Sequence, residues 1–225
     1  MTDELVLRAR GVSRTFGRGA SALVAVHGVS CDLAAGQQVA LGGPSGSGKT
    51  TLLHLFAGLD IPTIGTIEWP AIGSIHQLRP GPVAVVFQAP SLLPALDVVE
   101  NVALPRLLAG EDRHAARAGA IDALRRLDLA GLAAKLPEEL SGGQAQRVAV
   151  ARVLAGNPRL ILADEPTGQL DQASGTLVVE ALIEAATAHG AALIVNTHDR
   201  FVAHRFPTQW TMDRGRLRQE GSAAC

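Results

Sequence analysis

The chain has 225 residues, of which 47% are hydrophobic, and its formal net charge is −1. This length allows one large domain or a core with a subdomain, and the near-neutral charge offers no basic surface for nucleic acid or anionic lipid. No apolar run approaches the roughly 18 residues of a membrane span, and the acidic start Met1–Glu4 is unlike a signal peptide, so we expect no direct membrane insertion.

Residues 1 to about 40 alternate short strand-like runs with glycine turns, which predicts a β-rich start. Strands then alternate with helices, a pattern typical of the α/β class. Cys31 lies in an early strand-like run and Cys225 is the last residue. Two cysteines so placed form neither a metal-binding spacing nor a disulfide framework, and they suit a reducing cytosol.

A glycine-rich loop at residues 43–50 is the first motif that carries chemistry. It fits G-x-x-x-x-G-K-[ST] and stands between an apolar run, 39–42, and a helix-forming stretch, 51–57, the context that the motif requires. Its glycines let backbone N–H groups surround phosphates, Lys49 reaches the β- and γ-phosphates, and the Thr50 hydroxyl can bind Mg²⁺. The residues expected to contact nucleotide here are Gly43, Pro44, Ser45, Gly46, Ser47, Gly48, Lys49, Thr50 and Thr51. Alone, this loop fits kinases, GTPases, motors and recombinases as well.

A helical insertion is predicted at about residues 90–157, after the apolar strand-like run 83–87. Its Ala- and Arg-rich stretch 113–127 favours an amphipathic helix, with Ala118, Ile121 and Leu124 on the apolar side.

The insertion contains a second glycine motif, Ser141-Gly142-Gly143-Gln144. Ser141 as N-cap and Gln144 three residues later form a capping box for the helix 145–155, which Gly156 can close. A capping box does not require a glycine pair, and glycines lower the stability of a helix. The presence of two glycines despite this loss of stability indicates a function. A helix start with exposed N–H groups and a positive dipole end is suited to receive a γ-phosphate.

An acidic pair, Asp164 and Glu165, follows the continuous apolar run 160–163, which is typical of a strand buried on both faces of a parallel sheet. Because successive side chains on a strand diverge, the two carboxylates can have different roles. Beyond them the sequence predicts a helix at 171–189 closed by Gly190, a buried strand at 192–195 and a terminal hairpin at 212–217.

In order and spacing, these motifs resemble the nucleotide-binding subunit of ATP-binding cassette (ABC) transporters, from about Leu5 to about Glu220. Leu140–Gln144, extended by Ala145–Arg147 and Ala151–Arg152, is similar to the family signature. The resemblance implies a single ABC ATPase domain with a P-loop NTPase (RecA-like) core, an N-terminal antiparallel β subdomain and an inserted α-helical subdomain. It also implies that two copies meet head to tail, with each ATP between the phosphate loop of one and the signature of the other.

The resemblance assigns catalytic roles to Gln88, Glu165 and His198. Glu165 is similar to the general base that polarises the attacking water, and His198 to the switch histidine that contacts the γ-phosphate. Gln88 matches the glutamine loop, which touches metal and water and couples the site to an integral membrane permease. Thr50, Gln88 and Asp164 are the expected Mg²⁺ ligands. The signature residues expected at the nucleotide are Ser141, Gly142, Gly143 and Gln144.

Two positions differ from the common pattern of the family. Asp171 matches the aspartate that crosses the dimer, but Gln169 stands where a small residue or Asn usually precedes Leu-Asp. The chain has no Tyr, and Phe16 stands where the family offers an aromatic ring to adenine. A ring face can stack on a base without a hydroxyl group.

Three classes of function stay open at this point. The favoured one is the ATPase of a multi-subunit transporter, located at the cytoplasmic face of the inner or plasma membrane through its permease. An ABC ATPase that regulates a membrane complex, such as control of cell-wall hydrolases in division, would have a similar sequence. A soluble DNA-repair or ribosome-associated cassette would need coiled coils or a second cassette. Residues 56–60 and 100–105 resemble the lipoprotein-releasing and macrolide-exporter branch, whereas the short stretch 67–87 is similar to importers, so the direction of transport stays open.

Overall fold

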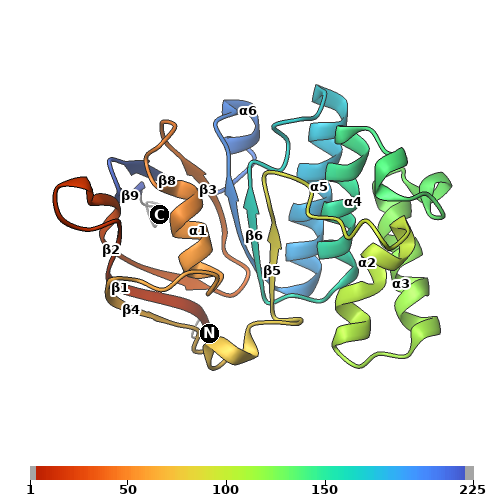
Figure 1. Cartoon of the computed structure of the whole chain (residues 1–225), viewed down its shortest axis with the longest axis horizontal. Coiled ribbons are helices and arrows are strands. Elements are labelled where there is room, and N and C mark those ends of the chain that lie inside the picture. Colours follow the sequence, from red (N-terminus) through yellow and green to blue (C-terminus); the bar gives the residue numbers. More distant parts are fainter. Residues whose placement is uncertain (1–3, 221–225) are drawn as a thin grey trace.

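The computed structural model describes residues 4–220 and contains two β-sheets with helices packed around the larger one (Figure 1). The smaller sheet is antiparallel, with strand order β2-β1-β4. The larger sheet has the order β5-β6-β7-β3-β8-β9, and its strands pair in parallel except for the hairpin that joins β8 to β9. The strands are β1 (Leu5–Phe16), β2 (Leu23–Ala34), β3 (Gln38–Gly42), β4 (Ile64–Glu68), β5 (Val83–Val86), β6 (Leu160–Asp164), β7 (Ala192–Asn196), β8 (Thr208–Asp213) and β9 (Arg216–Glu220).

The N-terminal sheet differs from the expected series of short strands. Strands β1 and β2 each run through 12 residues, because Gly11 and Gly28 form irregularities within the ladder instead of turns. Both glycines have positive φ, +58° and +63°, which is the backbone geometry of a bulge in an otherwise continuous strand. Cys31 is buried in this sheet, and burial raises the pKa of its thiol to about 12. Met1 to Asp3 and Cys225 lie outside the described residues.

The six-stranded sheet separates two hydrophobic cores. Alternate residues of its strands face opposite ways, so Leu41 and Ile194 join a core with helix α1 and the N-terminal sheet, whereas Ala40 and Val195 join a core with the remaining helices. All five residues of β6 and of β7 are buried, as expected for their continuous apolar runs. Figure 1 shows α1 on one side of this sheet and α4 and α5 on the other.

The helices of the second core are α2 (Val98–Leu108), α3 (Arg113–Arg126), α4 (Gly142–Ala155) and α5 (Gln172–His189), together with the short α6 (Arg200–Ala203), whereas α1 (Lys49–Phe56) covers the first core. Three helices of the second core, α3, α4 and α5, begin and end close to the predicted positions, whereas no bounds were predicted for α2 and α6. One prediction for α3 is wrong: Ala118 is exposed. The buried residues of α3 follow the spacing of Ala116, Ala120, Ala123 and Leu124, which places Ala118 on the opposite side of the helix.

Helix ends are fixed by the residues that follow or precede them. Helix α5 ends at Gly190, which has φ +62° in the left-handed conformation that glycine adopts without strain. The terminal hairpin is present, with Arg214 and Gly215 at its turn. Within residues 4–220, no helix is long and apolar enough to cross a bilayer.

Candidate functional site

The phosphate loop joins β3 to α1 and is packed too tightly for side chains at two of its glycines. A Cβ atom on Gly43 would lie 2.1 Å from the carbonyl oxygen of Met212, and one on Gly48 would lie 2.1 Å from that of Ala25. Both glycines also have strongly positive φ, +132° and +101°. Glycine is therefore required at both positions. Between them Pro44, Ser45 and Gly46 are exposed, so this part of the loop is accessible to a ligand.

Lys49 holds its ammonium group over this loop. The residue is only 7% exposed, and Nζ donates hydrogen bonds to the carbonyl oxygens of Gly43 and Pro44, each at 2.9 Å. An ammonium group has three donors, so one remains for an anion. The Ser47 hydroxyl is also buried and has no hydrogen-bond partner within residues 4–220. The Lys49 ammonium group and the Ser47 hydroxyl, which has no partner among the described residues, lie beside a glycine-rich loop. Together these groups fit the phosphates of a nucleotide.

Two neighbouring segments support the loop, and neither was anticipated in this role. The turn of the C-terminal hairpin contacts it through Gly215, whose N–H donates to the carbonyl oxygen of Ser47 at 3.0 Å. Strand β2 contacts it through Ala25, as the Gly48 geometry shows. The phosphate loop is thus held between the β8–β9 turn of the large sheet and strand β2 of the N-terminal sheet.

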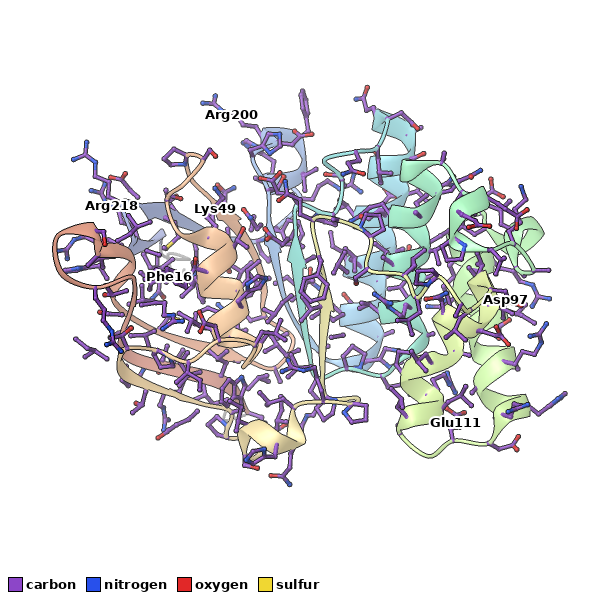
Figure 2. All side chains as sticks on the ribbon, in the orientation of Figure 1. Phe16, Lys49, Asp97, Glu111, Arg200 and Arg218 are labelled. Atoms are coloured by element: carbon purple, nitrogen blue, oxygen red, sulfur yellow. The ribbon has the colours of Figure 1, made fainter. Side chains whose placement is uncertain are left out.

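Phe16 lies near this support, because it pairs with Leu23 at the end of β2 that carries Ala25. Figure 2 shows Phe16 and Lys49 in the same half of the molecule. The Phe16 residue is 41% exposed, so it is not a core residue. The guanidinium carbon of Arg14 lies 4.6 Å from the centre of its ring, which is a cation–π contact on one ring face. Stacking of adenine on this ring stays a prediction.

Asp164, Glu165 and His198 come together at the edge of the sheet where β6 and β7 end. Asp164 is only 4% exposed, and the Asn196 side-chain amide donates a hydrogen bond to its carboxylate. Glu165 has φ +46°, a left-handed conformation rare for a non-glycine residue. Its Oε1 lies 3.4 Å from Nδ1 of His198. A non-glycine residue held in this conformation beside a histidine is typical of a functional site.

Gln88 is exposed and lies two residues beyond the end of β5. Its loop is tied to the signature helix α4 at two points. Gln146 Nε2 donates to the carbonyl oxygen of Phe87 at 3.1 Å, and the Arg152 guanidinium donates to the carbonyl oxygen and the hydroxyl of Ser91, each at 2.8 Å. Burial lowers the pKa of Arg152. A movement of the Gln88 loop would therefore be transmitted to α4.

The signature forms the start of α4 and lies apart from the phosphate loop. The predicted capping box is present: Gln144 N–H donates to Ser141 Oγ at 3.2 Å, and Ser141 N–H donates to Gln144 Oε1 at 2.9 Å. A Cβ atom on Gly143 would lie 3.3 Å from Leu170 Cδ2, so the signature's neighbours in its own chain belong to the loop before α5. Helix α4 packs against the sheet face opposite to α1. One chain therefore holds the predicted nucleotide contacts in two separate groups.

Asp171 caps helix α5. Its carboxylate accepts hydrogen bonds from the backbone N–H and the hydroxyl of Ser174, each at 2.9 Å, and these bonds lower the pKa of Asp171. This capping role is a sufficient reason for a carboxylate at position 171, and it requires no contact with a partner chain. Asp171 is also exposed, and its contact across a dimer stays a prediction.

Comparison with known proteins decides the family. Residues 26–168 match the family model described as ABC transporter. The chain belongs to this family. It is an ATP-binding and ATP-hydrolysing cassette, as the sequence motifs predict, and the expected P-loop NTPase fold is confirmed.

Curated relatives and solved structures match the chain along nearly its whole length. It is 38% identical to the lipoprotein-releasing system ATP-binding protein LolD of Legionella pneumophila and 39% identical to LolD of Shewanella oneidensis. These alignments cover 98% of this chain and 97% and 99% of the two relatives. The dimeric ATP-binding cassette MJ0796 bound to ADP and Pi superposes with a TM-score of 0.90 at 33% identity, covering 97% of this chain and all of that one. The cassette cbiO1 of Clostridium perfringens superposes with a TM-score of 0.80 at 28% identity, covering 96% and 88% of the two chains.

Proposed function

We propose that this chain is the ATPase subunit of a lipoprotein-releasing transporter, working as a pair of copies with an integral membrane permease. The observation that carries the proposal is the identity of 38–39% to LolD proteins along almost the full length of both chains. The resemblance of residues 56–60 and 100–105 to that exporter branch supports the same reading. The location that follows is the cytoplasmic face of the membrane that holds the permease.

In the proposed reaction, the phosphate loop and Lys49 bind the ATP phosphates. Thr50, Gln88 and Asp164 would hold Mg²⁺, and their hydroxyl, amide and carboxylate oxygens are the donors that this hard cation prefers. When bound, Mg²⁺ would neutralise charge on the β- and γ-phosphates. Three protein oxygens leave part of the octahedral coordination shell that Mg²⁺ prefers open, so the phosphates would complete it.

Glu165 is the proposed acceptor for the proton of the attacking water. Its side chain is 77% shielded from solvent, with 23% exposed, and it lies within 3.4 Å of His198. His198 is the more exposed partner, at 69% of its side chain, so it can turn toward a γ-phosphate while it orients Glu165. A general base must be held near its water, and a partner on one oxygen restricts its orientation.

A second copy completes the proposed site. The phosphate loop and the signature lie on opposite sheet faces of one chain, and α4 begins at the exposed residues Ser141 and Gly142. The start of a helix attracts a phosphate, and the phosphate loop of the same chain does not reach the start of α4. A head-to-tail pair would place each signature against the ATP of its partner. The dimeric state of the similar cassette MJ0796 supports this arrangement.

A groove of about 900 Å³ beside the Gln88 loop is the proposed docking site for the permease. It runs between β5, α2 and the segment after α4, and its lining includes Phe87, Val85, Leu104 and Leu108. Arg106 and Glu111 form an ion pair at its wall, with Nε and Oε2 2.6 Å apart (Glu111 is labelled in Figure 2). An apolar groove with charged walls suits a short amphipathic segment of a membrane subunit.

The direct test is depletion of this chain in its own cells, followed by separation of the membranes and detection of acylated lipoproteins. We expect lipoproteins to accumulate in the membrane where they are made, and wild-type protein, but not Glu165→Gln, to restore their sorting. Normal lipoprotein sorting, together with a defect in septal wall cleavage, would instead favour the regulatory ATPase and contradict the proposal.

A further inference from the structure

Asn196 is a buried amide at the end of an otherwise apolar strand. It is 1% exposed and follows four buried apolar residues, Ala192 to Val195, in β7. Strand β7 lies between β3 and β6, and Asn196 pairs with Leu41 on one side and with Asp164 on the other. Leu41 precedes the phosphate loop by two residues. Asn196 therefore occupies the position in the sheet between the phosphate loop and the acidic pair.

Asn196 holds both acidic residues. Its Nδ2 donates to Oδ1 of Asp164, and its backbone carbonyl oxygen accepts a hydrogen bond from the N–H of Glu165 at 3.0 Å. An ionised carboxylate only accepts hydrogen bonds, so the amide must present its nitrogen to Asp164. With Oδ1 occupied in this way, the orientation of the Asp164 carboxylate is fixed from one side.

Stability of the fold does not explain this amide. Its Oδ1 is buried and finds no hydrogen-bond partner among the described residues. A buried carbonyl without a partner destabilises a protein, and valine would fill the strand without such an atom. The remaining contact of the side chain that gives Asn an advantage over Val is the one with Asp164.

We infer that Asn196 is a positioning residue for the Mg²⁺ site: its amide orients the Asp164 carboxylate so that the other oxygen faces the metal and its water shell. The inference rests on the proposed role of Asp164. Groups that hydrogen-bond to a metal-ligating side chain typically change metal affinity by about 10- to 100-fold when removed.

The test uses Asn196→Val, which keeps the shape of a β-strand residue and removes the donor. Binding of a fluorescent ATP analogue is measured in EDTA and across a Mg²⁺ titration, and the melting temperature is recorded. We expect unchanged affinity in EDTA, a melting temperature at or above that of the wild type, and a half-saturating Mg²⁺ concentration about tenfold higher. Equal Mg²⁺ dependence of Asn196→Val and wild type overturns the inference.

Two further variants separate the possible causes. Val195→Ala removes buried volume from the same strand, so it should lower the melting temperature and leave the Mg²⁺ titration unchanged. If it raises the Mg²⁺ requirement as much as Asn196→Val does, the effect is general loosening of the strand and the inference fails. Asp164→Asn should raise the Mg²⁺ requirement further than Asn196→Val. An unchanged Mg²⁺ requirement in Asp164→Asn would remove Asp164 from the metal site. If the Mg²⁺ requirement rises in Asp164→Asn but not in Asn196→Val, the inference about Asn196 fails while the proposed role of Asp164 stands.

Discussion

Glu165 and Lys49 have separable tasks, and single substitutions distinguish them. Because Glu165 is cast as a base and contacts His198 at 3.4 Å, Glu165→Gln keeps the shape of the side chain but removes the proton acceptor. We expect ATP binding to remain while single-turnover hydrolysis falls by about 10²-fold or more. Lys49→Ala should instead weaken nucleotide binding, since the cation over the loop is lost. Near-normal turnover in Glu165→Gln would remove Glu165 from this role.

Phe16 offers a second prediction at the scale of one side chain. A stacked ring contributes roughly 1 to 3 kcal/mol per base, so Phe16→Ala should weaken ATP affinity by about one to two orders of magnitude. Phe16→Tyr or Trp should preserve it, and GTP should bind with modest loss, because stacking reads no hydrogen-bond pattern. The residue is 41% exposed, so its loss should alter unfolding little. Unchanged nucleotide affinity in Phe16→Ala, measured by fluorescence titration, would contradict the stacking.

At the scale of the phosphate loop, two glycines provide a matched comparison. Gly48 and Gly36 both have positive φ, but a Cβ atom meets the Ala25 carbonyl at 2.1 Å at Gly48 and finds no atom within 4 Å at Gly36. Gly36→Ala should cost about 1 kcal/mol of unfolding free energy, the strain of a left-handed residue. Gly48→Ala should cost about 3 kcal/mol or more and abolish ATP binding. Urea unfolding with nucleotide titration checks both, and equal losses at the two sites would show that packing on Ala25 is unimportant.

The elements show where sequence reasoning succeeds and where it stops. Motifs in which local chemistry dictates geometry, such as the capping box of Ser141 and the glycine end of α5, were predictable because a few adjacent residues determine them. The glycines of the first 40 residues were expected at turns, yet Gly11 lies in a bulge. A positive φ is compatible with either structure, and which one forms depends on the facing strand. The side-chain contact of Asn196 with Asp164 joins residues 32 positions apart. A polar residue at the end of an apolar strand was the available signal, but its partner depends on strand order.

For the whole molecule, assembly is the main prediction. If each signature completes the ATP site of the other copy, Glu165→Gln with ATP should elute as a dimer on a sizing column, and ADP should not replace ATP. Ser141→Arg, added to Glu165→Gln, should prevent the dimer through its bulk and charge. Ser141→Asp keeps the helix cap but opposes the γ-phosphate with a negative charge, so it should also prevent the dimer without loss of stability. A monomer in ATP at high protein concentration would contradict head-to-tail assembly.

Docking of the permease is predicted at the same scale. Leu108 lines the groove and is 63% exposed, so Leu108→Glu should fold normally but lose co-purification with an integral membrane partner from detergent. Ile64→Glu is the matched control, because Ile64 is 67% exposed and lies on β4, outside the groove. Retention of the membrane partner by Leu108→Glu, or loss of it by Ile64→Glu, would place the docking surface elsewhere.

The buried thiol of Cys31 makes opening of the N-terminal sheet measurable. Cys31 is 4% exposed and burial raises the pKa of its thiol to about 12, so neither access nor the thiolate form is available while the sheet is closed. In a Cys225→Ser background, alkylation of the remaining thiol would then proceed only in molecules whose sheet is open, so its rate would be proportional to the population of that open form. The strand that carries Cys31, β2, also places the carbonyl oxygen of Ala25 in close contact with Gly48. A chemical reaction at a position 17 residues before Gly48 would therefore report how large a fraction of molecules has the scaffold under the phosphate loop open.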